Sequence, residues 1–266
     1  MKNVVGWIAA VGVVAATLAA GAMAGSGKGQ PALPRGAVKV GDDTYYLGKR
    51  TVDGVQLEGY AFIHRRGGAA KPPGAPGGGG GGGTTCYTLL ASGAKWKTTE
   101  DFQIDAASAP PVVGTAMTDL MTDDVTTWET GASNPTIFGT GVRNDSYNAN
   151  LNAVDDVNGA EFGAIADAGV IAVTYTWGIF SGPSSRRQLV EWDMLFDDED
   201  FTWSTTGSTT AMDFQDIATH ELGHAMGLGH PSSTCTEETM YAYASNGETK
   251  KRDLNPGDVA GINTMY

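Results

Sequence analysis

His220-Glu221-Leu222-Gly223-His224-Ala225-Met226-Gly227-Leu228-Gly229-His230 decides the fold of this chain. Upstream, Asp213 suits the N-cap position of a helix and Asp216 suits its first turn, where negative charge is favoured. The sequence therefore predicts a helix that carries His220 and His224. Residues four apart lie on one helical face, so these two imidazoles can converge on one metal ion.

The third histidine reaches the same ion through a turn. Gly227 can adopt the left-handed conformation that ends a helix, and this turn returns His230 towards the other two. Three neutral nitrogen ligands leave one position of a tetrahedral ion for water, as in a catalytic zinc site. Glu221, one step round the helix, points beside the ion. Alternatively the histidines face solvent or pack in a core, but three of the chain's four histidines fall in this pattern, which favours the metal site.

At every defined position the stretch matches H-E-x-x-H-x-x-G-x-x-H, and in this it resembles the metzincin clan of zinc endopeptidases. The clan also has a methionine turn downstream, and Thr239-Met240-Tyr241 is the matching segment. The resemblance implies that Met240 lies beneath the three imidazoles as an apolar floor. Taken alone, a methionine in an apolar run would be core filler.

The residues after the motif indicate the branch of the clan. Tyr241 directly follows the methionine, as in matrixins, and Ala242 stands where serralysins and astacins offer a tyrosine ligand. Pro231 is instead typical of serralysins, but the glycine-aspartate repeats of that branch are absent from the sequence. The chain thus resembles a matrixin-like enzyme of a microbial secretory type, from Cys86 to its last residue.

The resemblance implies an α+β fold with a twisted, mostly parallel sheet, an antiparallel edge strand, an active-site helix and a C-terminal helix. In the family, the strand that matches residues 169–177 is the sheet edge above the zinc, along which an extended substrate pairs its backbone. From its residues alone, this segment could equally be an interior strand. Other elements are expected as strands at 102–104, 135–142 and 190–196, a helix at 113–129, a loop at 144–162, and a final helix capped by Asn255.

The chain has 266 residues, enough for one core of ordinary size and an appendage. Lys2 precedes an apolar run at 4–20 and the small-residue site Ala22-Met23-Ala24, which predicts a secretory signal peptide over residues 1–24. An uncleaved membrane anchor is the alternative, although many Ala and Gly residues make the run only weakly apolar. We expect a secreted monomer without stable membrane insertion after signal cleavage.

Charge is divided unevenly between the two parts that follow. Residues 25–83 hold 8 Lys or Arg and 4 Asp or Glu, a net +4, whereas residues 84–266 hold 8 and 26, a net −18. This balance argues against nucleic acid as a partner of the main domain. One explanation is a basic leader that docks on the acidic domain and keeps it latent. Solubility or life in salty water explains the same charge equally well.

Residues 44–52 and 55–64 predict two strands around Asp53-Gly54, a pair suited to a tight hairpin. A two-stranded hairpin is marginal alone, so we expect it to pack on the catalytic domain. The next residues are rich in glycine, and we expect them to form a flexible tether open to proteolysis. The predicted organisation is a signal peptide, a pro-segment, a linker and a zinc protease domain, at residues 1–24, 25–66, 67–85 and 86–266.

Two cysteines, Cys86 and Cys235, suit an exported protein with one disulfide. This bridge would tie the start of the catalytic domain to the loop after the third histidine. The alternative is a Cys86 thiolate that blocks the zinc, as in the cysteine switch of animal matrix metalloproteinases. The P-R-C-G-x-P-D motif of that switch is absent around Cys86, so the disulfide is preferred.

A cluster of carboxylates follows the strand expected at 190–196. Resemblance to the matrix metalloproteinases implies that Asp197 and Asp200 are calcium ligands, and a solvated acidic loop is the alternative. Leu195 stands where those enzymes place a histidine of a second, structural zinc. Because His64 is the sole histidine outside the main motif, no second histidine zinc site is expected.

Together these residues predict a zinc-dependent metalloendopeptidase. Zinc on the three histidines lowers the pKa of its water from about 15.7 to about 7 and polarises the scissile carbonyl, while Glu221 takes the water's proton and delivers it to the leaving nitrogen. A catalytically silent module that binds peptides and a hydrolase of small amides remain alternatives. Cleavage specificity stays open, because the pocket for the residue after the scissile bond is shaped by the loop between Met240 and Asn255.

Overall fold

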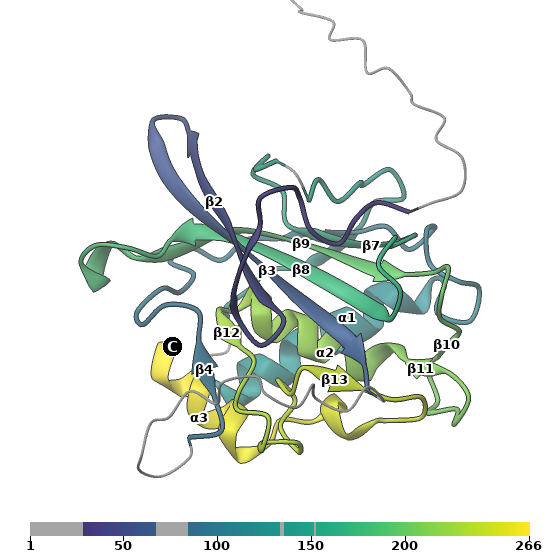
Figure 1. The fold of residues 1–266 in the computed structure, drawn as a ribbon. Coiled ribbons are helices and arrows are strands. Elements are labelled where there is room, and N and C mark those ends of the chain that lie inside the picture. Colours follow the sequence, from purple (N-terminus) through teal and green to yellow (C-terminus); the bar gives the residue numbers. More distant parts are fainter. Residues whose placement is uncertain (1–28, 68–84, 134–135, 152) are drawn as a thin grey trace, which may run out of the picture.

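The computed structural model describes residues 29–67, 85–133, 136–151 and 153–266 (Figure 1). The predicted signal peptide and nearly all of the predicted linker lie outside these residues. Among the residues described, no helix is long and apolar enough to cross a membrane.

A large mixed sheet, with strand order β1-β2-β3-β8-β9-β7-β5-β6, forms the centre of the molecule. Its strands are β1 (Val38–Gly41), β2 (Thr44–Val52), β3 (Val55–Arg66), β5 (Phe102–Ile104), β6 (Gly141–Arg143), β7 (Gly159–Gly163), β8 (Val170–Ile179) and β9 (Gln188–Asp197), with β13 (Tyr243–Ala244) paired to β3. Short pairs join β10 (Trp203–Ser204) to β11 (Met212–Asp213) and β4 (Thr88–Leu89) to β12 (Leu228–Gly229).

The strands that follow residue 100 in the chain form the predicted arrangement, a mostly parallel sheet with one antiparallel strand. Strands β6, β5, β7 and β9 are mutually parallel, and β8 joins β9 in the antiparallel direction. The α+β fold class is therefore confirmed.

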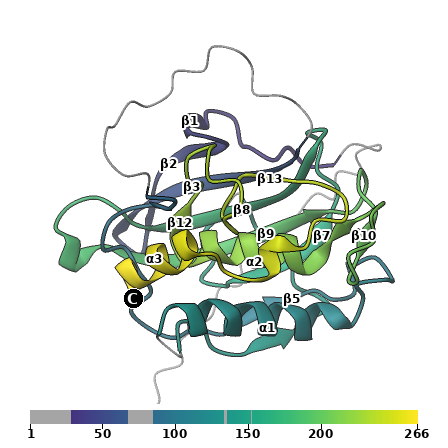
Figure 2. The ribbon, with the colours of Figure 1, turned by 90° about the horizontal axis from the view of Figure 1, so that it is seen from below.

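Three helices lie on one face of this sheet (Figures 1 and 2): α1 (Ala116–Gly131), α2 (Phe214–Ala225) and α3 (Pro256–Met265). Trp128 of α1 is fully buried and donates from Nε1 to the backbone oxygen of Thr219 in α2, at 2.7 Å. A large core cluster fills the helical face, and a smaller cluster around Ile63, Tyr175 and Leu195 fills the opposite face. Strands with both faces covered need apolar residues throughout, and β8 is buried along nearly its whole length.

The predicted N-terminal hairpin is confirmed as β2 and β3. Asp53 (φ 49°) and Gly54 (φ 79°) form its turn, and both take the left-handed conformation that a tight hairpin turn requires. The hairpin does not stand alone, because β3 pairs antiparallel with β8 from Glu58 to Arg65. Strand β8 is consequently interior in the whole chain, whereas within residues 86–266 it is the antiparallel edge strand that the resemblance implies.

Other expected elements differ from the structure at their ends. The strand expected at 135–142 is limited to β6, which begins only at Gly141. The loop expected at 144–162 contains β7, a short strand that forms by pairing with β5 and β9. Helix α1 begins at Ala116 rather than at Val113, because residues before it form turns. The helix after Asn255 begins at Pro256 as predicted.

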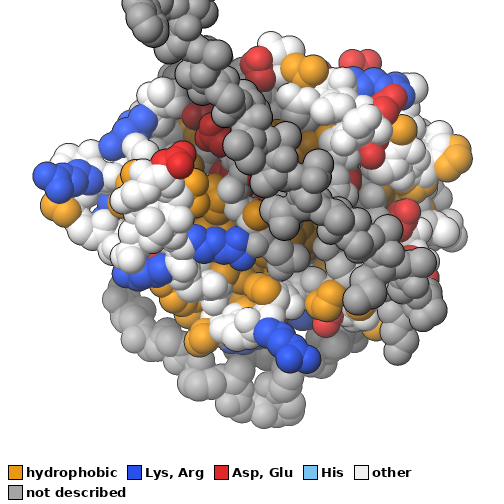
Figure 3. All heavy atoms as spheres, turned by 90° about the horizontal axis from the view of Figure 1, so that it is seen from above, with side chains coloured by type: hydrophobic (Ala, Val, Ile, Leu, Met, Phe, Trp, Pro, Cys, Tyr) orange, Lys and Arg blue, Asp and Glu red, His pale blue; other side chains and the backbone are white. Residues whose placement is uncertain are grey.

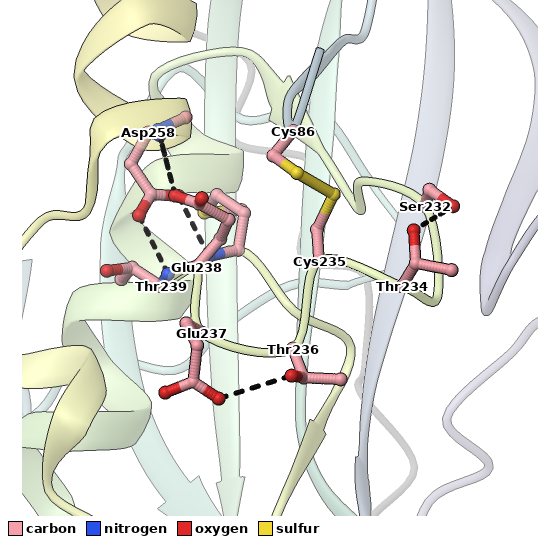
Figure 4. Close-up of a disulfide and its surroundings, with 11 residues drawn as sticks. Cys86, Ser232, Thr234, Cys235, Thr236, Glu237, Glu238, Thr239 and Asp258 are labelled. Atoms are coloured by element: carbon pink, nitrogen blue, oxygen red, sulfur yellow. Dashed lines mark hydrogen bonds between the residues drawn. A yellow bond between two sulfur atoms is a disulfide. The ribbon is translucent and has the colours of Figure 1, made fainter. Parts of the chain in front are cut away.

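The predicted disulfide is present between Cys86 and Cys235, with a Cα–Cα distance of 5.6 Å (Figure 4). It joins the start of the second part of the chain to the loop that follows the last histidine. Beside it, the Glu238 carboxylate accepts the backbone N–H groups of Gly257 and Asp258, at 3.0 and 3.2 Å. The loop is thus held both to Cys86 and to the start of α3.

Loss of the disulfide is predicted to destabilise the fold, since the bridge spans 149 residues and restricts the unfolded chain. The variant Cys86→Ser/Cys235→Ser should lose about 2–5 kcal/mol in free energy of unfolding, measured by urea denaturation. A reducing agent should lower the free energy of unfolding of the wild type by a similar amount and should leave that of the double variant unchanged. Two titratable thiols in the unreduced, denatured wild type would contradict the bridge.

Candidate zinc site

Helix α2 holds two of the three motif histidines. The Asp213 carboxylate caps its first turn by accepting the Asp216 N–H at 3.2 Å, as the sequence predicts, and Arg252 binds the same carboxylate through two nitrogens. Gly227, with φ 98°, ends the helix in the left-handed conformation. All of α2 except Gln215 is buried, so the helix presents its histidines inside the molecule.

The three histidines converge through their Nε2 atoms. The distances are 3.1 Å between His220 and His224, 3.1 Å between His224 and His230, and 3.3 Å between His220 and His230. A tetrahedral zinc ion with Zn–N bonds of about 2.0–2.1 Å separates its ligand nitrogens by about 3.3–3.4 Å. The donor set therefore fits one zinc ion.

Each Nδ1 atom faces a backbone carbonyl. His220 Nδ1 is 2.6 Å from the oxygen of Thr239, and His224 Nδ1 is 2.9 Å from that of Leu228. His230 Nδ1 is 2.7 Å from the oxygen of Asp42, which lies in the N-terminal segment. A carbonyl only accepts, so each Nδ1 carries the proton and each Nε2 presents its lone pair to the metal position.

Burial keeps the imidazoles neutral. It lowers the pKa of His220 and His224 well below the ordinary value, and lowers that of His230 to about 4. Neutral imidazole is the form that binds a metal ion. The site is therefore poised for a cation at ordinary pH.

Met240 lies against the α2 backbone behind the histidines. A Cβ added at Gly223 would lie only 2.2 Å from the Met240 sulfur, so glycine is required for this close approach. The Asp258 carboxylate of α3 accepts the backbone N–H groups of Thr239 and Met240, at 2.8 and 3.1 Å. The side chain that completes the cap of α3 thus also positions the methionine turn, a role that the sequence did not reveal.

Glu221 is fully buried beside the histidines, and both its oxygens are engaged. Its Oε1 is 3.0 Å from His64 Nδ1, and its Oε2 accepts the Thr174 hydroxyl at 2.5 Å. Burial raises the pKa of Glu221 to about 8, opposed by the Thr174 hydrogen bond and the charge of Lys251. The sequence predicted that Glu221 lies beside the metal, but it did not reveal the neighbours His64, Thr174 and Lys251.

The cleft in front of the histidines is filled by β3. One side of β3 pairs with β8, and the other side pairs in parallel with β13 at Arg65 and Arg66. Phe62 stacks on the His224 ring with centroids 4.0 Å apart and an interplanar angle of 7°. A peptide strand therefore occupies the groove between β8 and the segment after the methionine turn.

The remaining predicted site residues lie apart from this cleft. Asp197 is buried, and its carboxylate accepts backbone N–H groups of Ile165, Glu199 and Asp200 at 3.1–3.3 Å. Calcium at Asp197 and Asp200 stays a prediction. Leu195 packs in the smaller core cluster.

His64, His220 and Glu221 also lie close enough to share a metal ion. This second arrangement uses His220, which the main site needs, and the Lys251 ammonium is 2.9 Å from His64 Nε2. Because His220 serves the main site and both nitrogens of His64 already have partners, the three-histidine arrangement is the better metal site.

Comparison with known proteins places these features in a family. Residues 179–266 match the sequence model of the matrixin family of M10 peptidases. Human matrilysin is 41% identical over 69 residues, which cover 26% of this chain and 25% of matrilysin. The metalloendoproteinase 2-MMP of Arabidopsis thaliana is 36% identical over 94 residues, 33% of this chain and 22% of that protein. Human matrix metalloproteinase-19 is 33% identical over 96 residues, 35% of this chain and 18% of that protein.

The matches span a quarter or less of the length of these relatives. The family match, residues 179–266, includes the stretch that carries the three converging histidines and the methionine turn. The histidine site and this match show that residues 179–266 are similar to the matrixin family.

Proposed function

We propose that the protein is a secreted zinc endopeptidase that hydrolyses internal peptide bonds. The observation that carries this proposal is the convergence of the Nε2 atoms of His220, His224 and His230 at 3.1–3.3 Å, with the Glu221 carboxylate buried beside them. The named relatives are metalloproteinases, which supports the same activity. Secretion is supported by the signal-like start of the sequence.

The residues present account for the chemistry. Zinc, when held by the three histidines, supplies a Lewis acid that acidifies water and polarises a carbonyl. Glu221 acts as the general base: it accepts a proton from the attacking water and delivers it to the leaving nitrogen. Thr174 orients the carboxylate through its hydroxyl.

Replacing the general base tests this assignment. Glu221→Gln should lower the cleavage rate of an unstructured protein such as casein by about 10²–10⁴-fold, because the proton acceptor is lost. Bound zinc, measured by elemental analysis, should stay at one per chain. The control is Glu237→Gln, whose side chain is 79% exposed, and it should match the wild type. More than a few per cent of activity in Glu221→Gln would refute the role of this residue.

Removal of zinc should abolish cleavage, and zinc added back should restore it. Chelation should also lower the melting temperature, because a metal that binds only the folded state stabilises it by mass action. His230→Ala should lose the response of both activity and melting temperature to zinc. If the chelated protein kept both its melting temperature and its full cleavage activity, the protein would not be a zinc enzyme. Zinc binding without any cleavage would indicate a silent peptide-binding module.

We further propose that residues 25–66 form a pro-segment that keeps the enzyme latent. In support, β3 lies in the cleft, Phe62 covers His224, and His64 holds the Glu221 carboxylate. A substrate strand can reach β8 only after β3 has left. The proposed linker at 67–85 is the expected site of the activating cleavage.

Charge attraction contributes little to this docking. Among the described residues, the ion pairs of Lys39, Lys49 and Arg65 stay within the N-terminal segment. Figure 3 shows basic, acidic and apolar side chains interspersed on the described surface seen from above. Backbone pairing and packing, such as Trp177 against Gly59 and beneath Arg50, therefore explain the contact better than the opposite net charges do.

Latency predicts that cleavage of the linker activates the enzyme. A full chain with a specific protease site placed in residues 68–84 should be nearly inactive when intact and active after cleavage. Activity per molecule should rise on dilution, since the severed segment then rebinds as a separate molecule. Phe62→Ala should increase the activity of the intact chain by weakening the docked state by about 3 kcal/mol. Val55→Ala, at the partly exposed turn of the hairpin, is the matched control. Equal activity before and after cleavage would refute latency.

A further inference from the structure

One buried pocket beside Glu221 is filled by a side chain of the N-terminal segment. The His64 ring is fully buried, and its centroid lies 3.9 Å from that of His220. Because β3 lies between β8 and β13, any peptide that replaces β3 must place one of its own side chains where His64 now lies. The chemistry of this pocket therefore decides which peptides fit the cleft.

Lys251 closes the inner end of the pocket. Its side chain is fully buried, and Nζ donates to the backbone oxygens of Tyr241 and Tyr243, both at 2.8 Å, and to His64 Nε2 at 2.9 Å. An ammonium has three N–H donors, so the side chain in the pocket supplies the one acceptor that the backbone does not. Since Nε2 of His64 accepts, its Nδ1 carries the proton and donates to Glu221.

The charge of Lys251 also lacks a close counter-charge. In the part of the chain that the structure describes, no carboxylate oxygen lies within 4.0 Å of its Nζ. Asp216 accepts the backbone N–H of Lys251 at 2.8 Å, and with Glu248 it acts on the ammonium only through longer-range charge. Burial is the main reason that the pKa of Lys251 falls to about 8. Once His64 has left, one N–H of this buried ammonium has no acceptor, and such a group attracts an anionic acceptor.

We propose that Lys251 determines substrate specificity, and that the enzyme prefers glutamate, and next glutamine, immediately after the scissile bond. This inference rests on the proposed endopeptidase function. Lys251 belongs to the loop between the methionine turn and α3, and His64, which contacts both Glu221 and Lys251, marks where the substrate side chain would end.

The length of these side chains suits the pocket. Glutamate and glutamine carry their terminal oxygen the same number of bonds from the backbone as His64 carries Nε2. Glutamate gains further because hydrogen bonds between charged groups are about twice as strong as neutral ones. Leucine fills similar space but leaves one buried N–H of Lys251 without an acceptor, and lysine brings a second positive charge.

The intact full chain tests the pocket without any catalysis. His64→Gln should keep a melting temperature about 3 °C or more above that of His64→Leu, because only glutamine accepts from Lys251. In a Lys251→Met background this difference should vanish or reverse. In the control background Lys250→Met, whose side chain is 33% exposed and does not contact His64, it should persist. The comparison is made within each background, so a general loss of stability does not obscure it.

Cleavage then tests specificity. The zinc-loaded full chain, cleaved in its linker, is given matched peptides with Glu, Gln, Leu or Lys at one position, and the products are identified by mass spectrometry. Cleavage before Glu should be about tenfold or more faster than before Leu, both in the wild type and in Lys250→Met. Lys251→Met should lose this preference.

Two results would overturn the proposal: faster cleavage before Leu than before Glu in the wild type, or an unchanged preference in Lys251→Met. Equal melting temperatures of His64→Gln and His64→Leu would also count against it. If no peptide is cleaved at all, the proposed function fails, and the melting temperatures still decide whether Lys251 selects an acceptor.

Discussion

The structure depends on the burial of three imidazoles and a carboxylate between a sheet and a helix. Buried polar groups need partners, and here each Nδ1 atom finds one in a backbone carbonyl: Thr239, Leu228 and Asp42. These three carbonyls belong to separate segments, which must all be in place together. The supports are accordingly rigid, with Asp258 holding the methionine turn and Arg252 holding the cap of α2.

The third of these carbonyls explains why the N-terminal segment is part of the folded unit. Asp42 provides the partner of His230, and β3 covers the open side of β8, where backbone groups would otherwise be unpaired. A substrate strand can supply the same backbone pairing. On the proposed function, the N-terminal segment and a substrate would compete for one set of contacts, and the strength of the segment's binding would be the barrier to activation.

Local signals in the sequence were sufficient for the elements that carry the motif. The cap at Asp213, the glycine at 227 and the Asp53-Gly54 turn each act within a few residues, and all three predictions are confirmed. Strand β7 was missed because its five residues, Gly159–Gly163, gain their conformation from the neighbouring strands rather than from their own preferences. The covering of β8 by β3 was missed for the same reason, because this pairing joins segments far apart in the chain.

The environment of Glu221 shows the same limit at the level of single side chains. His64 contacts Glu221 across 157 residues and Lys251 across 187, and no motif in the sequence connects them. Yet the three groups satisfy one another: Lys251 donates to His64, and His64 donates to Glu221. On the proposed function, a side chain that blocks Glu221 so completely would also match the pocket that a substrate side chain uses. Latency and specificity would then be two consequences of one contact, and a change in Lys251 would alter both.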